Sequence, residues 1–386
     1  MDFDLRIHGF TDAVISENLL DLSDKLPHWS KLPYAIEKKS EPHLVEYLSK
    51  PIADISGNFF LPLYEWGRKI DEGTYGKIFL CKRKKYLPIY NAGQRMSFSP
   101  DNTAGRDIVI KESDIHLSPA ELKMSEEIRK NIIQEETDAH MHEAAVLTLA
   151  YRAVKDKIPG SVPKVYEVFC KKNTDGSLKS LCISMEYIKG ETLLKSLRQN
   201  LTKEPNNDAI FINIITQLAK IIDVLQTKLR MNHRDIKVNN VLLRNGTNQV
   251  VLIDYGFACI ANGVQEPAAE FSKIQAGSYF GSRVACFKTG RDMCQFLYSL
   301  HCYFPFEKYI SEKLIAVIKP WLMVKYKYGV ANLLNGLYEN GSPSIVKLDK
   351  IEYNEGIYIF LKKEEVDPIH CGPKAILADL MNYEKS

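Results

Sequence analysis

Short apolar runs alternate along the chain with longer segments in which apolar residues recur at helical spacing. The short runs at 108–110 and 181–185 predict buried strands. Helical periodicity covers 138–155 and 208–228, and a further apolar helix is expected to begin at 290. Near the end of the sequence, the pattern predicts a hairpin around Asn354-Glu355-Gly356 and a short amphipathic helix from about Pro373 to Met381.

Two further apolar runs, 241–243 and 250–253, lie on either side of Asn245 and Gly246. An Asn-Gly pair between apolar runs is the strongest short-range hairpin signal, because these residues tolerate the positive φ angles of a tight turn. The sequence therefore predicts a hairpin that turns the chain back on itself.

Polar residues that suit phosphate chemistry lie at both ends of this hairpin. Asp235, Lys237 and Asn240 precede it, and Asp254 follows it directly. We expect the hairpin to bring these side chains together in one cleft. Oxygen ligands with a nearby lysine suit Mg²⁺ and phosphate. A buried polar hairpin with coincidental charges is the alternative.

The order H-R-D-I-K-V-N-N around Asp235, followed by D-Y-G from Asp254, resembles the catalytic and metal-binding loops of the protein kinase family. The resemblance implies that Asp235 orients the substrate hydroxyl and that Lys237 neutralises the transferring phosphate. It also implies that Asn240 and Asp254 hold Mg²⁺. A lysine two places after the aspartate is typical of Ser/Thr-directed members.

Residues 70–79 resemble the family's glycine-rich strand-turn-strand, which covers the phosphates of ATP. Gly73 and Gly76 occupy two of its glycine positions, where backbone N–H groups can approach anionic oxygen. Ile78 follows and is expected to help bind the nucleotide. Asp71 stands where the first glycine is expected, and its charge would weaken nucleotide binding. Taken alone, the two glycines would also fit an ordinary hairpin.

Lys111 closes the first short apolar run, as in the family's V-A-I-K strand, so the resemblance implies that it contacts the inner phosphates. A solvated strand-edge lysine is the alternative. Such a lysine needs a carboxylate partner to fix its position. Glu143, on the helix predicted over 138–155, is our candidate. Glu135 and Glu136 compete, but they lie in a charged run that is typical of a solvated helix face.

The strand at 181–185 leads into a segment that resembles the kinase hinge. By position, Met185 guards the back of the adenine pocket, and Glu186 and Ile188 offer main-chain contacts to adenine. A methionine at this position is also common as an ordinary core residue. Recognition of adenine through the backbone leaves no signature in the side chains.

Downstream, Asp292 is expected to bind the backbone of the catalytic loop and support it. The family closes its activation segment with A-P-E, and no such triplet closes 257–289, although 277–283 resembles a reduced counterpart. We expect packing to hold this segment in a constitutively active state. The alternative is control by phosphorylation, with the phosphate pairing with Arg234. The candidate phosphorylation sites are Ser272, Ser278, Tyr279 and Ser282.

Composition narrows the possible partners and location. The chain has 386 residues and a net charge of only +3, so its overall electrostatic field does not favour binding to nucleic acid. We expect no membrane span and no secretion signal, because the sequence has no long uncharged apolar stretch and begins without a cationic-then-apolar segment. Its eight cysteines lack C-x-x-C spacing, which suits reduced thiols in an intracellular, cytoplasmic protein. The pairs His301-Cys302 and His370-Cys371 are a poor template for a metal site.

The resemblance implies an α+β, two-lobed protein-kinase-like fold. Its small N-lobe would be rich in β-strand with one main helix, and its larger C-lobe mostly helical. We expect an N-terminal extension over 1–65 packed on the core, an N-lobe over 66–189 with a polar insertion near 83–106, and a C-lobe over 190–386 with a divergent C-terminal part.

The expected function is transfer of the γ-phosphate of ATP, with Mg²⁺, to a Ser/Thr hydroxyl of a protein. A small-molecule phosphotransferase with a kinase fold and a pseudokinase scaffold are the alternatives. The C-terminal tail and the sequence around Leu225–Cys259 also resemble the divergent Ser/Thr kinases of large DNA viruses, for which the location would be host cytoplasm or virion.

Overall fold

The structure is a computed structural model, and its described residues divide into two compact units. One unit is drawn from 1–148 and 163–187, and the other from 149–162 and 188–386. The described residues are 34–38, 41–47, 52–53, 59–61, 63–73, 76–83, 87–88, 106–115, 117–172, 178–201, 207–260, 287–326, 329–335, 338–339, 342–343 and 367–385.

The first unit is built on an eight-stranded sheet in the order β5-β2-β1-β10-β11-β9-β7-β6. An additional pairing of β5 with β7 closes the sheet on itself, so that β6 alone is appended to the ring. The strands are β1 (Tyr34–Lys38), β2 (Glu41–Tyr47), β5 (Leu63–Glu65), β6 (Lys69–Gly73), β7 (Gly76–Arg83), β9 (Asp107–Asp114), β10 (Val165–Lys172) and β11 (Leu178–Glu186).

Three of these strands, β1, β2 and β5, lie before residue 66 in the sequence. Strand β1 pairs in parallel with β10, β2 pairs with β1 and β5, and β5 returns to β7. The N-terminal region is thus hydrogen-bonded into the sheet that carries Lys111. Strands β3 (Ile52–Ala53), β4 (Phe59–Leu61) and β8 (Leu87–Pro88) form a separate small sheet, and β8 is the described part of the insertion predicted at 83–106.

Strand β9 confirms the apolar strand predicted before Lys111. Its backbone pairs with β7 on one side and β11 on the other, so it is a central strand. Ile108 and Ile110 are fully buried. Because side chains alternate along a strand, Lys111 and Glu112 point to opposite faces of the sheet.

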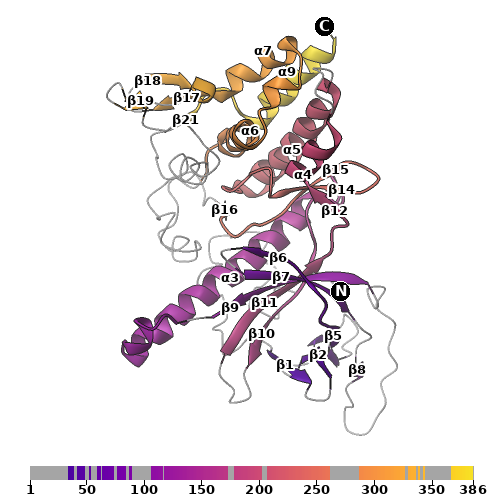
Figure 1. Cartoon of the computed structure of the whole chain (residues 1–386), viewed down its shortest axis with the longest axis vertical. Coiled ribbons are helices and arrows are strands. Elements are labelled where there is room, and N and C mark those ends of the chain that lie inside the picture. Colours follow the sequence, from indigo (N-terminus) through magenta and orange to yellow (C-terminus); the bar gives the residue numbers. More distant parts are fainter. Residues whose placement is uncertain are drawn as a thin grey trace. The chain divides into compact units, whose positions relative to one another are not determined.

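A single long helix, α3 (Glu126–Val154), runs alongside β6, β7 and β9 (Figure 1). It begins twelve residues before the helix predicted at 138–155. Half of the residues in the first three turns are charged, so the apolar periodicity that predicts a helix at 138–155 does not extend to them. They contain no proline or glycine, and their side chains are good helix formers. The 3-10 turn η4 (Glu121–Lys123) precedes the helix.

The second unit is mostly helical. Helix α5 confirms the predicted apolar helix at 208–228 and contacts α6, α9 and β15 (Figure 1). Helices α6 and α9 confirm the segments predicted from 290 and from Pro373, and α9 continues to Lys385. The helices are α4 (Leu193–Asn200), α5 (Asp208–Leu229), α6 (Arg291–Tyr303), α7 (Glu312–Ile318) and α9 (Pro373–Lys385), with 3-10 turns η7 (Phe306–Lys308), η8 (Lys319–Leu322) and η9 (Leu333–Asn335).

Short strands complete this unit. The predicted Asn-Gly hairpin is confirmed as β14 and β15, with Gly246 at a φ of 79° in the turn. The hairpin predicted around Asn354 lies outside the described residues. The strands are β12 (Gly190–Thr192), β13 (Met231–Asn232), β14 (Val241–Arg244), β15 (Gln249–Leu252), β16 (Cys259–Ile260), β17 (Met323–Tyr326), β18 (Gly329–Asn332), β19 (Tyr338–Glu339), β20 (Ser342–Pro343) and β21 (Asp367–Pro368).

Across the described ranges, no helix is both long enough and apolar enough to cross a membrane.

Candidate active site

Lys111 and Glu143 form the ion pair that the sequence predicts. Lys111 Nζ lies 2.7 Å from one carboxylate oxygen of Glu143 and 2.8 Å from the other. The two side chains are only 11% and 9% exposed. The competing residues, Glu135 and Glu136, are exposed on the charged part of α3. Strand β9 thus supplies the buried ammonium group of Lys111, and both carboxylate oxygens of Glu143 on helix α3 hold this group in place.

His140 lies one turn before Glu143 on α3 and is buried. Burial, together with the positive charge of Lys111, lowers the pKa of His140 to about 3. The imidazole is therefore neutral at neutral pH, so it adds no second positive charge beside Lys111.

The predicted glycine-rich segment forms a hairpin of β6 and β7, closed by the pair Gly73 and Gly76. Gly76 has a φ of 144°, and a Cβ built there would lie 2.6 Å from the carbonyl oxygen of Glu112. Only glycine fits at this position. Ile78 is the cross-strand partner of Lys111, so the two side chains share a face of the sheet.

Asp71, the departure from the glycine pattern, is exposed on β6. Its Oδ1 accepts a hydrogen bond of 2.8 Å from the backbone N–H of Glu72. The Asp71 carboxylate therefore forms a hydrogen bond within its own strand. The residues at the tip of the hairpin, 74–75, lie outside the described residues.

The predicted hinge residues follow from strand β11. Met185 pairs with Val109 of β9 and is partly buried, as is Glu186. The backbone N–H of Glu186 donates to the carbonyl of Lys164 at 2.8 Å. A main-chain contact from Glu186 to a ligand would therefore use its carbonyl oxygen. Ile188 belongs to the second unit, where its side chain is buried.

In the second unit, Lys237 and Asn240 converge on one oxygen of Asp235. Lys237 Nζ donates to Asp235 Oδ2 at 2.8 Å, and Asn240 Nδ2 donates to the same atom at 2.9 Å. The amide of Asn240 also donates to the backbone carbonyl of Asp235 at 2.9 Å. These bonds fix the direction of the carboxylate within the loop.

Burial raises the pKa of Asp235 to about 6, and the negative charge of Asp254 acts in the same direction. Lys237 and the hydrogen bond from Asn240 oppose this rise. Burial also opposes the charged form of Lys237, but the Asp235 carboxylate more than offsets it, so the pKa of Lys237 is raised. A carboxylate with a pKa near 6 is ionised at neutral pH yet basic enough to accept or orient a hydroxyl proton.

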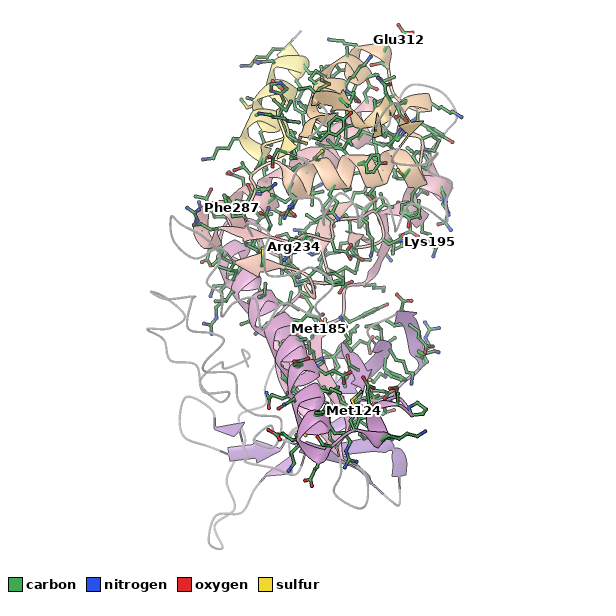
Figure 2. All side chains as sticks on the ribbon, turned by 90° about the vertical axis from the view of Figure 1, so that its left-hand side faces the viewer. Met124, Met185, Lys195, Arg234, Phe287 and Glu312 are labelled. Carbon is green, nitrogen blue, oxygen red and sulfur yellow. The ribbon has the colours of Figure 1, made fainter. Side chains whose placement is uncertain are left out.

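Asp254 follows β15, and its backbone adopts a φ of 65°, in the left-handed region. Arg234 has a φ of 67°, and Figure 2 labels it among the closely packed side chains of this unit. Left-handed backbone at non-glycine residues costs free energy and clusters at functional sites. The backbone N–H of Ile253 donates to the carbonyl of Asn240 at 3.0 Å, which ties the two ends of the hairpin together.

The residues near the hairpin ends fit Mg²⁺. Asn240 offers an amide oxygen and Asp254 a carboxylate, and Mg²⁺ prefers such oxygen ligands. Asp254 contributes to the raised pKa of Asp235, so the two carboxylates share one electrostatic environment. A bound cation would relieve the repulsion between them.

Asp292, at the start of α6, supports the catalytic loop as predicted. Its Oδ2 accepts from the backbone N–H of His233 at 2.9 Å and from the amide of Asn232 at 3.0 Å. Its Oδ1 accepts from the backbone N–H of Arg234 at 3.0 Å. The carboxylate is buried, so these bonds hold the loop without competition from water.

One supporting contact was not predicted. Ser299 Oγ accepts a hydrogen bond of 3.0 Å from the backbone N–H of Val238, within the same loop. A serine in an apolar helix carries no motif, so only its spacing from Asp292 could have revealed it. The ring of Tyr255 also packs edge-on against His233, with 4.6 Å between centroids.

The expectation of reduced thiols needs a correction at one position. Cys259, on β16, is disulfide-bonded, whereas Cys81, Cys170, Cys182, Cys294, Cys302 and Cys371 are free. Spacing alone could not indicate this bond, because the sequence contains no C-x-x-C pattern. The described part of the chain contains no group of three or more His, Cys, Asp or Glu residues that could hold a metal.

Residues 261–286 lie outside the described residues, and with them the reduced counterpart at 277–283 and all the phosphorylation candidates. The strand pair β13–β16 marks where the described chain enters this segment.

Comparison with known proteins matches residues 161–281 to the protein kinase domain. A subunit of the EKC/KEOPS complex, bud32 of Dictyostelium discoideum, is 33% identical over 93 residues, which are 24% of this chain and 36% of that protein. A probable serine/threonine-protein kinase of the same organism is 33% identical over 76 residues, which are 20% of this chain and 4% of that protein.

The serine/threonine-protein kinase PknA of Nostoc sp. is 30% identical over 97 residues, which are 25% of this chain and 15% of that protein. The chain thus spans about a third or less of the length of these relatives. The matched domain includes Asp235 and Asp254, whereas Lys111 and Glu143 precede it and are recognised by their motif and their geometry. Residues 161–281 are thus similar to the protein kinase domain, and the β-rich first unit and mostly helical second unit are consistent with a kinase-like fold.

Proposed function

We propose that the protein is an ATP- and Mg²⁺-dependent serine/threonine protein kinase. The observation that carries the proposal is the convergence of Lys237 and Asn240 on one oxygen of Asp235. A structural ion pair would not need an asparagine on the same oxygen, nor a pKa near 6 on the carboxylate. Both properties suit a group that orients a hydroxyl for transfer.

Each unit contributes separate tasks to this reaction. In the first unit, Lys111, held by Glu143, binds the inner phosphates, and the turn at Gly73 and Gly76 lets backbone N–H groups approach the outer ones. Met185 guards the back of the adenine pocket, Glu186 and Ile188 each offer main-chain groups to adenine, and Ile78 lies on the same face of the sheet as Lys111.

In the second unit, Asp235 orients the substrate hydroxyl, and Lys237 compensates the charge on the transferring phosphate. Asn240 and Asp254 hold Mg²⁺, which supplies charge neutralisation to the terminal phosphates when bound. The lysine two places after Asp235 supports Ser/Thr specificity.

Transfer to a small molecule is the second candidate. It is favoured by the absence of an A-P-E triplet at the end of 257–289, because that triplet belongs to the peptide-binding segment of the family. A pseudokinase scaffold is disfavoured, because Lys111, Asp235, Asn240 and Asp254 are all present.

Incubation with γ-labelled ATP, Mg²⁺ and either a protein mixture or a metabolite mixture distinguishes the candidates. We expect label in protein, recovered as phosphoserine or phosphothreonine after hydrolysis. Label confined to metabolites would instead establish the small-molecule reaction. Nucleotide binding without any transfer would establish the scaffold.

The variant Asp254→Asn is the matched control for this assay. The amide is nearly isosteric but lacks the charge that holds Mg²⁺, so transfer should fall by about 100-fold or more. The melting temperature should stay close to that of the wild type. Full turnover by the variant at saturating Mg²⁺ would show that Asp254 is not the metal ligand.

A further inference from the structure

Helix α6 presents two buried hydrogen-bond acceptors to the catalytic loop. Asp292 lies in its first turn, and Ser299 follows seven positions later. Seven residues are about two helical turns, so the two side chains share one face of the helix at a separation of roughly 10 Å. Asp292 binds the backbone of His233 and Arg234, whereas Ser299 binds the backbone of Val238.

Val238 is held by its backbone from two elements. Its N–H donates to Ser299 Oγ at 3.0 Å, and its carbonyl accepts from the N–H of Leu194, at the start of α4, at 3.4 Å. Val238 and Ser299 are both fully buried. Because no water competes in this environment, losing the hydroxyl would leave a buried N–H group without its partner.

The position of Val238 in the sequence gives this contact its significance. It lies between Lys237 and Asn240, the two residues that bind Asp235 Oδ2. Among the described residues, the hydrogen bonds of Asp292 go to residues that precede Asp235 in the loop. Ser299, by contrast, binds a residue that follows Asp235, at the point where Lys237 and Asn240 flank Val238.

We propose that Ser299 is a positioning residue that holds Val238, and through it Lys237 and Asn240, in register with Asp235. The inference rests on the proposed phosphotransfer function, because it assigns Ser299 a part in that reaction. Helix α6 then acts as a two-point support, with Asp292 before Asp235 and Ser299 after it.

Two substitutions distinguish the effect of losing the Ser299 hydroxyl from the effect of changing the side-chain volume. Ser299→Ala removes the acceptor and leaves a small space, whereas Ser299→Cys fills the volume but accepts a hydrogen bond only weakly. Ser311→Ala is the matched control. Ser311 is a serine of the same unit that caps α7 through the N–H of Leu314 and also binds Asp208, away from the loop.

For both Ser299 variants we expect kcat to fall by about 10- to 100-fold, while KM for ATP changes by less than about twofold. Ser311→Ala should lower the melting temperature without any of these changes. Wild-type behaviour of Ser299→Cys, or equal kinetic losses in Ser299→Ala and Ser311→Ala, would overturn the inference.

Amide hydrogen exchange provides a readout that needs no activity. In Ser299→Ala the amide of Val238 should exchange faster than in the wild type, while the amides of His233 and Arg234, which Asp292 holds, keep their protection. If the wild type transfers no phosphate, the proposed function fails, and this exchange pattern alone decides the inference. Unchanged exchange at Val238 would overturn it.

Discussion

Two buried lysine–glutamate pairs lie on opposite faces of one sheet, and their surroundings differ. Lys111 meets Glu143 from helix α3 at 2.7 Å. Lys171 of β10 meets Glu112 of β9 at 2.9 Å, with both side chains only 6% exposed. Lys111 and Glu112 are neighbours in the sequence, so a single step along the strand separates the two environments.

The pair of Lys171 and Glu112 is enclosed by further contacts within its own unit. Ser180 Oγ donates to Glu112 Oε1 at 2.6 Å, and Lys171 Nζ lies 4.4 Å from the centroid of the Trp66 ring. These contacts compensate both charges locally. The same pair of residue types is therefore a structural feature on one face, whereas on the other it presents a candidate phosphate-binding lysine.

Substitution of Lys111 should have the largest effect on activity. Lys111→Met and Glu143→Gln should each reduce kcat/KM, the lysine variant by about 1,000-fold, because the charge that binds the phosphates is lost or misplaced. The double variant should lose far less than the product of the single losses, since both changes disrupt one interaction. Steady-state kinetics on folded protein measures this. Fully multiplicative losses would mean that Glu143 does not act through Lys111.

Substitution of Lys171 should affect stability instead. Lys171→Met leaves Glu112 as an uncompensated buried charge and should cost about 3 kcal/mol in the free energy of unfolding. The protein that remains folded should keep its kcat. Denaturant unfolding followed by activity checks this, and the double variant Lys171→Met with Glu112→Leu should recover much of the loss. A loss of kcat as large as that of Lys111→Met would erase the distinction between the two faces.

A third lysine–carboxylate pair, Lys237 with Asp235, should differ from the other two because it makes kcat/KM depend on pH. The pKa of Asp235 is raised to about 6, so its active, ionised form is lost as pH falls through that value. We expect kcat/KM to decrease about tenfold for each pH unit below the pKa. A pH–rate profile at saturating Mg²⁺ measures this decrease. A profile that stays flat down to pH 4.5 would mean that ionised Asp235 is not required.

The smallest effect is expected for an exposed pair on the same helix as Glu143. Lys130 and Glu126 lie 2.7 Å apart, but their side chains are 67% and 72% exposed. Lys130→Met should change the melting temperature by no more than about 2 °C and leave activity unchanged, because water and salt screen the pair. A calorimetric scan checks this, and a shift as large as that of Lys171→Met would show that distance matters more than burial.

Much of the candidate site could be predicted from the sequence, since its residues lie close together along the chain or carry a motif. The order around Asp235, the Asn-Gly hairpin and Asp254 requires only local turns, and β14 and β15 form it as expected. The partner of Lys111 was predicted because helical periodicity places Glu143 on the face with Leu147, and Leu147 is buried. The charged run that contains Glu135 and Glu136 was interpreted as a solvated helix face, but the start of α3 at Glu126 could not be fixed, because such a face has no apolar period.

The sequence by itself thus determined the local elements, the catalytic loop and the identity of the ion pair at Lys111. Only the tertiary structure decided that Glu112, the next residue in the sequence, pairs with Lys171 of strand β10. It also decided that β5 closes the sheet against β7, and that Ser299 supports Val238. These contacts join residues far apart in the chain through burial and backbone hydrogen bonds, which depend on geometry and leave no pattern in the order of residues.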